Sequence, residues 1–422
     1  MKNSYNLGDP SFLSNPVPML SQMRAEASLV KVKIPIIGST WVTTNYAATS
    51  QVAKAKDTFF LTGLGAGLKK KGNAGLPWWA PPSFRAMAEN MLGKDDPEHR
   101  RLRKLVDQAF VRRGIRDMRP NIAKIAHTRV ASLGSGTVNI VPGFCRAFPL
   151  EVIADLLGVA DEDREAFASM GNAMVDFNGG LFAIIKMLRT IGKFWHFVGQ
   201  MVRDMRINPQ PGLVTDLIAV EAEGQQLTED ELVSMIFLLM FAGFETTTHL
   251  ISGSIIALDQ NPDQRAWLFT DFDNRIEPAT EELCRFVSSV AGTKPRIAAN
   301  DIEVDGQLIK KGDKVMALPL AANYDPAVFD QPEILRLDRF PNPHLSFSTG
   351  SHFCLGMQLA RVELQEALRA LFTAHSTLGV SKPVIYAKRP GFRGIKHCLL
   401  YTSPSPRDVE ESRFAGGGWK KK

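Results

Sequence analysis

Cysteine is scarce in this sequence of 422 residues. The four cysteines are Cys145, Cys284, Cys354 and Cys398, and no two of them form a Cys-x-x-Cys pair. This spacing excludes a zinc ribbon and the attachment motif of c-type haem. It also disfavours a disulfide framework, so a reducing cytoplasm is the expected compartment.

Long hydrophobic runs are also missing. The apolar run from Met235 to Phe244 has about ten residues and ends at Glu245, whereas a membrane-spanning helix needs roughly 20. The N-terminal residues, MKNSYNLGDP, are polar and unlike a secretory signal. We therefore expect a soluble, cytoplasmic protein without a membrane span.

No Gly/Ser-rich or Pro-rich linker divides the chain before its C-terminal end, and no internal repeat is visible. With 45% hydrophobic and 22% charged residues, the composition is that of an ordinary globular protein. The sequence therefore predicts one large, mainly α-helical domain with small β-sheets rather than a string of modules.

Two stretches are dense in β-branched residues. LVKVKIPIIGSTWVTT predicts a two-stranded meander, and RIAANDIEVDGQLIKKGDKVMALPL, with a turn at Asp305-Gly306, predicts a hairpin followed by a strand. Between them, residues 60–90 are rich in Gly, Pro and Trp, and a long irregular stretch inside a compact domain is usually functional. Helical patterns dominate from about residue 97 to 289.

The clearest helical pattern is a run of some 30 residues between Thr228 and Asn261. Thr228 and Glu231 have the spacing of a capping box, while Asn261 and Pro262 end this helix and begin the next. A helix of this length spans roughly 45 Å. Its apolar residues lie on nearly all faces, so we expect it to cross the core.

The middle of this helix, AGFETTT, is unusual for a buried helix. Gly243 costs ~1 kcal/mol relative to alanine, the threonines can bond back to the preceding turn, and Glu245 brings a carboxylate into the core. One interpretation is a kinked helix with a satisfied polar patch. The other is a groove opened by Gly243, in which Glu245 and Thr246 relay protons beside a bound ligand.

Cys354 lies in FSTGSHFCLG, directly before another helical pattern. The N-terminus of that helix should lower the pKa of the thiol and favour the thiolate. Gly350 and Gly356 permit tight turns and the close approach of a flat ligand, Phe347 could pack against it, and His352 could reach an anionic edge. A thiolate with open coordination space suits haem iron. A buried structural cysteine and a nucleophilic cysteine are the alternatives.

The net charge of +6 is partly concentrated in HRRLRKLVDQAFVRRGIR. Its Lys and Arg residues are Arg100, Arg101, Arg103, Lys104, Arg112, Arg113 and Arg116. This segment is either a solvated helix face or a docking face for an acidic partner or an anionic cofactor. We expect no nucleic-acid partner, because no nucleic-acid-binding motif accompanies these cations.

Six stretches together resemble the cytochrome P450 family of haem-thiolate enzymes, in its soluble, bacterial-type branch. FSTGSHFCLG is similar to the family's haem-binding loop, and AGFET to the oxygen-activating part of its long central helix. HRRLR and PRIA resemble segments that bind the haem propionates, EELCR supplies a Glu-x-x-Arg pair, and ANYDPAVFDQPEILRLDRF resembles the meander before the loop. The stretches occur in the family's order, over roughly residues 10 to 397.

The resemblance implies a cytochrome P450 fold in which haem b lies between the long central helix and the helix after Cys354. It implies that Cys354 is the iron ligand and that Glu245 and Thr246 are catalytic residues that deliver protons. Glu282 and Arg285 are implied to anchor a buried network behind the loop. The residues implied to bind the cofactor are His99, Arg103, Ala242, Gly243, Arg296, Phe347, Gly350, His352 and Gly356.

The implied activity is a monooxygenase that inserts one oxygen atom from O2 into an apolar small molecule. Because the chain has no flavin or nicotinamide domain, electrons would come from a separate ferredoxin-type protein and its reductase, docked on the basic face around Arg100 to Arg116. A haem-thiolate peroxygenase or isomerase, and a non-catalytic haem-binding or sensor protein, are the alternatives. The substrate pocket is expected to draw on residues 60–90, the segment 170–200, the long helix near Ala242, and the region of Val290 and Ala291. The segment 170–200 is either a mobile lid over an apolar site or an ordinary packed helix.

The sequence departs from the family's pattern in the loop, the meander and the C-terminus. The loop has Ser348 and Ser351, and the meander has Tyr324 where soluble members often carry arginine. After GIKHCLLYT the chain continues with SPSPRDVEESRFAGGGWKKK, which is polar and lacks periodicity. We assign residues 1–402 to the cytochrome P450 domain and predict that residues 403–422 form a disordered, non-native tail.

Overall fold

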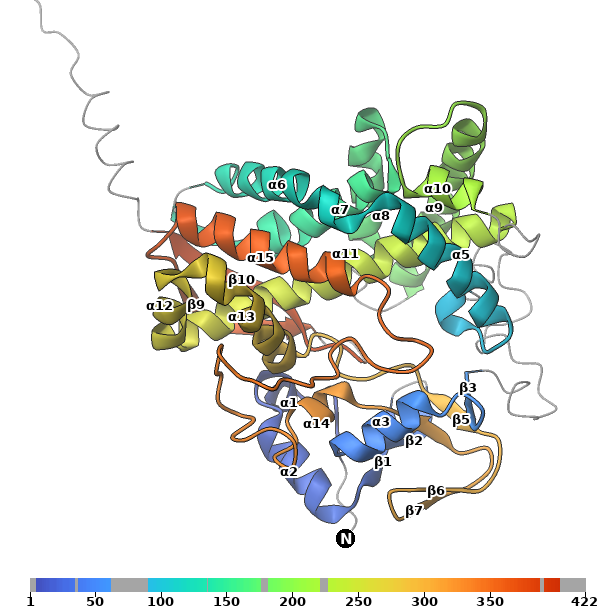
Figure 1. Ribbon diagram of the computed structural model, residues 1–422, viewed down its shortest axis with the longest axis vertical. Helices are drawn as coiled ribbons and strands as arrows, with labels where there is room; N and C mark the ends of the chain where they lie inside the picture. Colours follow the sequence, from blue (N-terminus) through green and yellow to red (C-terminus); the bar gives the residue numbers. More distant parts are fainter. Residues whose placement is uncertain are drawn as a thin grey trace, which may run out of the picture.

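The computed structural model describes residues 5–34, 37–61, 90–134, 136–175, 181–220, 227–387 and 391–402. Most of the stretch at 60–90 and the whole tail at 403–422 therefore lie outside the described residues. Figure 1 shows a large helical part above a smaller part, which is made of short helices and strands.

The helical part contains most of the long helices, as the periodicity between about 97 and 289 predicts. These helices are α5 (Glu98–Arg113), α6 (Arg119–Ala131), α7 (Ala147–Leu157), α8 (Arg164–Val175), α9 (Leu181–Ile207), α10 (Leu213–Ala219), α11 (Glu229–Gln260), α12 (Pro262–Thr270), α13 (Phe272–Val287) and α15 (Met357–Ala374). Short helical turns lie between them at η1 (Met91–Gly93), η2 (Ile115–Met118), η3 (Val141–Arg146) and η4 (Asp161–Asp163). The smaller part contains α1 (Pro10–Ser14), α2 (Val17–Glu26), α3 (Tyr46–Lys54) and α14 (Pro319–Asn323).

The described strands form three small sheets. The five-stranded sheet has the order β1 (Leu29–Ile34), β2 (Gly38–Thr43), β8 (Lys314–Met316), β5 (Arg296–Ala298) and β3 (Phe59–Phe60). The three-stranded sheet has the order β4 (Gly136–Asn139), β10 (Gly394–Thr402) and β9 (Gly379–Ala387). Strands β6 (Ile302–Val304) and β7 (Gln307–Ile309) pair with each other. The strands β1, β2, β3, β5, β6 and β7 lie in the smaller part (Figure 1). The mainly α fold with small β-sheets is confirmed.

Both strand-rich stretches fold as predicted. β1 and β2 pair as an antiparallel meander. Asp305 and Gly306, with φ values of 45° and 77°, make the turn between β6 and β7, because an Asp-Gly pair tolerates the left-handed backbone of a tight hairpin. β8 follows this hairpin and pairs with β2 in parallel, which ties the hairpin to the N-terminal meander.

The long helix is α11, with 32 residues. The Glu231 N–H donates to Thr228 Oγ1 at 3.2 Å, and the Thr228 N–H donates to a Glu231 carboxylate oxygen at 2.9 Å, so the predicted capping box is present. At the other end, the Asn261 side chain donates to the Ala257 carbonyl at 2.8 Å, and α12 begins at Pro262. Both ends of the helix are therefore where the sequence predicts them.

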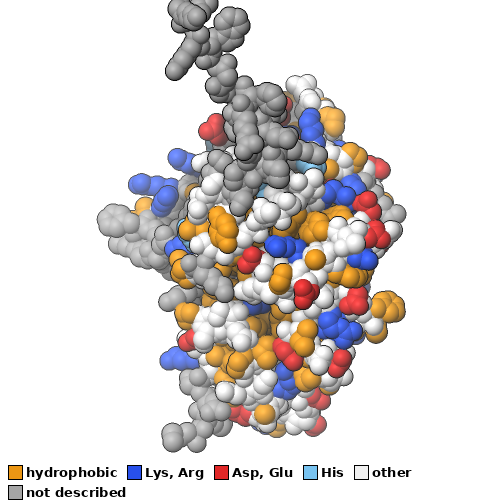
Figure 2. Space-filling view, turned by 90° about the vertical axis from the view of Figure 1, so that its left-hand side faces the viewer, with side chains coloured by type: hydrophobic (Ala, Val, Ile, Leu, Met, Phe, Trp, Pro, Cys, Tyr) orange, Lys and Arg blue, Asp and Glu red, His pale blue; other side chains and the backbone are white. Residues whose placement is uncertain are grey.

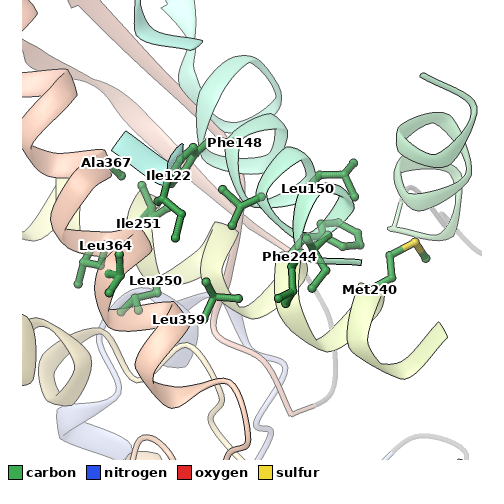
Figure 3. Packing of buried hydrophobic residues seen from close by; sticks show 14 of the residues in the cluster. Ile122, Phe148, Leu150, Met240, Phe244, Leu250, Ile251, Leu359, Leu364 and Ala367 are labelled. Atoms are coloured by element: carbon green, nitrogen blue, oxygen red, sulfur yellow. The ribbon is translucent and has the colours of Figure 1, made fainter. Parts of the chain in front are cut away.

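α11 lies in the hydrophobic core. Figure 3 shows Leu250 and Ile251 of α11 facing Leu359 and Leu364 of α15, and each fully buried side chain of this kind contributes about 1.5–3 kcal/mol. Among the described helices, α11 alone is long and apolar enough to cross a membrane, but most of that apolar stretch is buried inside the protein. This burial is what a core helix requires.

Candidate active site

The loop that carries Cys354 is closed by its own backbone. The Cys354 N–H donates to the Phe347 carbonyl at 3.0 Å, and the Phe353 N–H donates to the Gly350 carbonyl at 3.1 Å. Gly350 has a φ of 79°, and a Cβ there would lie 2.7 Å from the Ala53 carbonyl oxygen at the end of α3. A glycine is required at this position both for the turn and for the packing of the loop against α3.

An ion pair between α13 and α15 supports the loop from behind. Arg361 of α15 donates to both carboxylate oxygens of Glu281 of α13, at 2.7 and 2.6 Å, and its guanidinium lies 5.0 Å from the Phe347 ring. The His344 ring nitrogen lies 3.2 Å from the same carboxylate. Burial raises the pKa of Glu281, but the hydrogen bonds from His344 and Arg361 and the charge of Arg361 outweigh it and lower that pKa to about 2.

The Cys354 thiol is half-buried at the start of α15. Burial raises its pKa, and the Gly356 N–H and the charges of Arg103 and Arg361 offset this only in part. The expectation that the helix N-terminus lowers the pKa is therefore wrong for the polypeptide by itself, because desolvation of the thiolate is the larger effect.

A metal at Cys354 would need ligands from outside the protein. In the described part of the chain, no three His, Cys, Asp or Glu side chains gather closely enough to form a metal site. Haem would bring its own four nitrogen ligands and would need only the Cys354 thiolate from the protein, so the donor set fits haem. A Cβ at Gly356 would meet no atom within 4 Å, which leaves room beside the start of α15 for a flat group.

Four of the predicted cofactor-binding residues converge beside this loop. His99 and Arg103 come from α5, Arg296 from β5 and His352 from the loop itself. The rings of His99 and His352 lie 4.1 Å apart between their centroids. Burial, together with the charges of His99, Arg296 and Lys294, lowers the pKa of His352 to about 3. We call His99, Arg103, Lys294, Arg296 and His352 the cationic cluster.

The cluster is well anchored to the backbone around it. Arg103 donates to the Phe353 carbonyl at 2.7 Å and to Asp107 at 2.9 Å, and Arg296 donates to carbonyl oxygens at the end of α3 at 3.3 Å. Asp96 lies 3.4 Å from His99. Arg296 is buried, Arg103 is half-buried and Lys294 is exposed. A buried cation such as Arg296 is costly unless an anion joins it. The two propionates of haem are carboxylates of the kind that arginine and histidine bind, so the cluster fits this cofactor.

The predicted residues of α11 lie on different faces of the helix. Ala242 is exposed and Thr246 is half-buried, although most of their neighbours on α11 are buried. The Thr246 hydroxyl donates to the Ala242 carbonyl at 2.7 Å, the bond back to the preceding turn that the sequence predicts. A Cβ at Gly243 would lie 3.1 Å from Ile153 of α7. α11 therefore packs closely on α7 at this glycine, and the groove expected at Gly243 stays a prediction.

Sequence reasoning missed three polar residues near these positions. Lys294 joins the cationic cluster through its charge, and only its place two residues before Arg296 pointed to it. His249 contacts Glu245 at 3.1 Å, a contact that the spacing of four residues could have suggested. Glu363 of α15 is buried and hydrogen-bonded to Thr247, and burial raises its pKa well above the usual value. The only sequence signal for Glu363 was its place as a polar residue on the apolar face of a predicted helix.

The Glu282–Arg285 pair has the predicted structural role. Arg285 donates to both Glu282 carboxylate oxygens, at 2.7 and 2.8 Å, and to the carbonyls of Asn323 and Pro332 at 2.8 Å each. Arg339 of the meander adds a further bond to Glu282 at 3.1 Å. Both members of the pair are fully buried, and removing one partner of such a pair typically costs about 3–5 kcal/mol.

Tyr324, which stands where soluble members often carry arginine, is accommodated without loss of a partner. Its hydroxyl donates to the Phe286 carbonyl at 2.7 Å, and its ring lies 5.6 Å from the guanidinium of Arg285. The substitution therefore keeps the meander attached to α13.

The fold and site define a class: a mainly α protein with one cysteine at a helix start beside a cationic cluster. A family model described as Cytochrome P450 matches residues 189–378. The polyketide biosynthesis cytochrome P450 PksS of Bacillus subtilis is 34% identical over 364 residues, which are 85% of this chain and 88% of that protein. The vitamin D(3) 25-hydroxylase of Pseudonocardia autotrophica is 32% identical over 409 residues, which are 95% of this chain and 97% of that protein.

The comparison with solved structures agrees. The structure of PksS from Bacillus subtilis matches with a TM-score of 0.84 at 30% identity and covers 94% of this chain and 100% of that one. This chain belongs to the cytochrome P450 family. It is therefore an oxidoreductase that binds haem and uses molecular oxygen as a monooxygenase.

Proposed function

We propose that this enzyme inserts one oxygen atom from O2 into an apolar small molecule, with Cys354 as the iron ligand and a separate ferredoxin-type protein and its reductase as electron donors. The observation that carries the proposal is the cationic cluster, because its carboxylate-binding side chains lie beside the loop that holds Cys354 at the start of α15. We also propose a cytoplasmic location, which suits such a donor.

The cationic cluster would hold the haem propionates. His99, Arg103, Arg296 and His352 supply the donors, and Lys294 is added to the set that the sequence predicts. Gly350 fixes the turn of the loop, Phe347 packs beside it, and Gly356 leaves space for the porphyrin face. When bound, a thiolate-ligated haem supplies O2 activation, since the thiolate donates electron density that favours cleavage of the O–O bond.

Glu245 and Thr246 would move protons toward the oxygen-binding side. The Thr246 hydroxyl donates to the Ala242 carbonyl, so its lone pairs can accept a hydrogen bond from water. Glu245 can exchange a proton with water, and positioned proton transfer of this kind contributes typically 10²–10⁴-fold to a rate. The residues therefore supply a donor and an acceptor one position apart on α11.

The substrate is proposed to be apolar. One relative is a vitamin D(3) 25-hydroxylase and another acts in polyketide biosynthesis, and both names point to large, poorly polar molecules. We place the pocket at Ala242 of α11, at Val290 and Ala291 after α13, and at the described parts of the segment 170–200, in α8 and α9. Val290 pairs with Phe392 in an isolated bridge, which brings the segment before β10 to the same place.

The test begins with the reduced, carbon monoxide-bound difference spectrum of haem-loaded protein. Cys354→Ser should abolish the thiolate-type spectrum, whereas Cys145→Ser, at a buried cysteine of η3, should preserve it. An unchanged spectrum in the first variant would refute the assignment of the ligand.

Turnover assays then distinguish a monooxygenase from a peroxygenase and from a haem-binding or sensor protein. Product formation that needs NADPH, a surrogate ferredoxin and its reductase supports the monooxygenase. Turnover with peroxide alone would indicate a peroxygenase. A substrate panel that gives neither spin-state shifts nor products would indicate a haem-binding or sensor protein.

A further inference from the structure

His249 is a buried histidine of α11. Its ring lies between the carboxylate of Glu245, the proposed proton carrier, and strand β10. His249 and Glu245 are one turn apart, 2% and 1% exposed, and His249 Nε2 lies 3.1 Å from a Glu245 carboxylate oxygen. On the other side of the ring, the Ile395 N–H of β10 donates to His249 Nδ1 at 3.3 Å. The imidazole therefore bridges a side chain of α11 and the backbone of β10.

These two contacts fix the tautomer of the ring. A backbone N–H can only donate, so Nδ1 must accept and carries no proton. A neutral imidazole then has its proton on Nε2, which points at the Glu245 carboxylate. A doubly protonated ring would set two N–H groups against each other at Ile395, so the arrangement favours the neutral ring as a hydrogen-bond donor to Glu245.

The ring has little freedom to move. A Cβ at Gly394 would lie 2.5 Å from His249 Nε2, so β10 approaches the ring as closely as only a glycine permits. The Phe392 ring centroid lies 6.4 Å from that of His249. Because α11 packs directly on β10, the imidazole is held between the two elements.

We propose that His249 is a positioning residue for the monooxygenase reaction, which holds the Glu245 carboxylate in place through Nε2–H and ties it to β10 through Nδ1. This inference rests on the proposed role of Glu245 as a proton carrier. A hydrogen bond that fixes a carboxylate keeps it within reach of one water, and a displacement of about 1 Å can lower a rate by as much as 10²-fold.

Two substitutions separate the two bonds of the ring. In His249→Gln the side-chain amide reaches the place of Nε2, so a donor to Glu245 is retained. In His249→Asn the shorter amide reaches only the place of Nδ1, so the bond to Ile395 can persist while the donor to Glu245 is lost. His127→Asn, at an exposed histidine of α6, is the matched control.

The first readout is the fate of electrons in the haem-loaded enzyme with a turnover substrate. We expect His249→Asn to lower the product formed per NADPH roughly tenfold, with the electrons lost to peroxide. The loss should be smaller than the 10²–10⁴-fold that proton transfer contributes, because Glu245 itself is retained. His249→Gln and His127→Asn should stay within about twofold of the unmodified enzyme, a change of ~0.4 kcal/mol in barrier. Equal uncoupling by Asn and Gln, or none by Asn, would overturn the proposal.

The second readout is spectroscopic and does not depend on turnover. Nitrogen NMR of the unmodified protein in its diamagnetic, reduced, carbon monoxide-bound form should find His249 neutral with its proton on Nε2. A proton on Nδ1, or a doubly protonated ring, would overturn the proposal. Hydrogen exchange at the Ile395 amide should accelerate in His249→Gln and stay slow in His249→Asn. If the thiolate spectrum were absent from the unmodified protein, the proposed function would fail instead, and the NMR result would still report on His249.

Discussion

At the scale of single residues, the cysteine loop contains a strained position. Ser348 has a φ of 61°, a left-handed conformation that costs an L-residue other than glycine ~1–2 kcal/mol. Replacing Ser348 by glycine relieves this strain, but it also raises the conformational entropy of the unfolded chain, which costs about 0.4–1 kcal/mol of stability. We therefore expect Ser348→Gly to stabilise the protein by about 0.5–1 kcal/mol, seen as a higher urea midpoint.

A neighbouring serine provides the control. Ser351 lies in the same loop but does not have a positive φ. Ser351→Gly should therefore show only the effect on the unfolded chain and lower the midpoint slightly. A midpoint that falls equally in both variants would contradict the strain at Ser348.

The residue scale also separates what the sequence could predict about the site from what it could not. The loop around Cys354, its glycines and the helix that follows are specified by neighbouring residues, so they could be predicted from the sequence. The pKa of Cys354 could not, since desolvation depends on the elements that cover the thiol. The contact of Gly243 with Ile153 depends on which face of α11 meets α7, and residue spacing along a helix buried on nearly all sides does not reveal that face.

At the scale of secondary structure elements, the ion pair of Glu281 and Arg361 joins α13 to α15 behind the loop. Its carboxylate has a pKa of about 2 instead of an ordinary 4.5. A lowered pKa in the folded state means that the contribution to stability is complete above about pH 5 and is lost as the pH falls toward 2. Because the Glu281 side chain is 31% exposed, we discount the full shift and expect about 1–2 kcal/mol at neutral pH.

Glu281→Gln tests this dependence. The difference in unfolding free energy between the unmodified protein and the variant should be largest at neutral pH and shrink steadily between about pH 5 and pH 3, because glutamine does not titrate. Urea unfolding at a series of pH values measures it. Asp273→Asn is the control. The ion pair of Asp273 with Arg369 joins the same two helices at 2.6 Å, but the Asp273 side chain is 79% exposed. Such exposed pairs contribute little to the free energy of unfolding. A difference independent of pH would count against the ion pair.

Elements with local signals were predictable, and contacts between distant elements were not. The capping box at Thr228 and the turn at Asp305-Gly306 each use residues within a few positions of one another, so the sequence specifies them directly. The bond from Ile395 to His249 joins positions 146 residues apart. It exists only because β10 returns to α11, and no spacing within either element indicates that return.

At the scale of the whole molecule, the C-terminal end of α5 combines basic side chains with an exposed apolar one. The face in Figure 2, on the left of the molecule in Figure 1, mixes acidic, basic and hydrophobic side chains. α5 lies on the other side of Figure 1 and ends in two adjacent arginines, Arg112, which is exposed, and Arg113. Beside them, Val111 is 81% exposed, which adds an apolar contact point to a basic surface. Arg103, on the same helix, donates to the carbonyl of Phe353, next to Cys354.

This arrangement suits the docking of an acidic electron donor on α5, close to the proposed iron ligand. Reversing both charges with Arg112→Glu and Arg113→Glu should slow electron transfer from a surrogate ferredoxin about tenfold at low salt, because complementary charge mainly increases the rate of association. The difference should narrow at high ionic strength, where the Debye length falls to about 3 Å near 1 M salt. Lys33→Glu with Lys311→Glu reverses the same number of charges on exposed residues of the smaller part and should leave the rate unchanged. Equal rates for both double variants at low salt would move the docking site away from α5, while a deficit that persists at high salt would point to a change inside the site instead of at its surface.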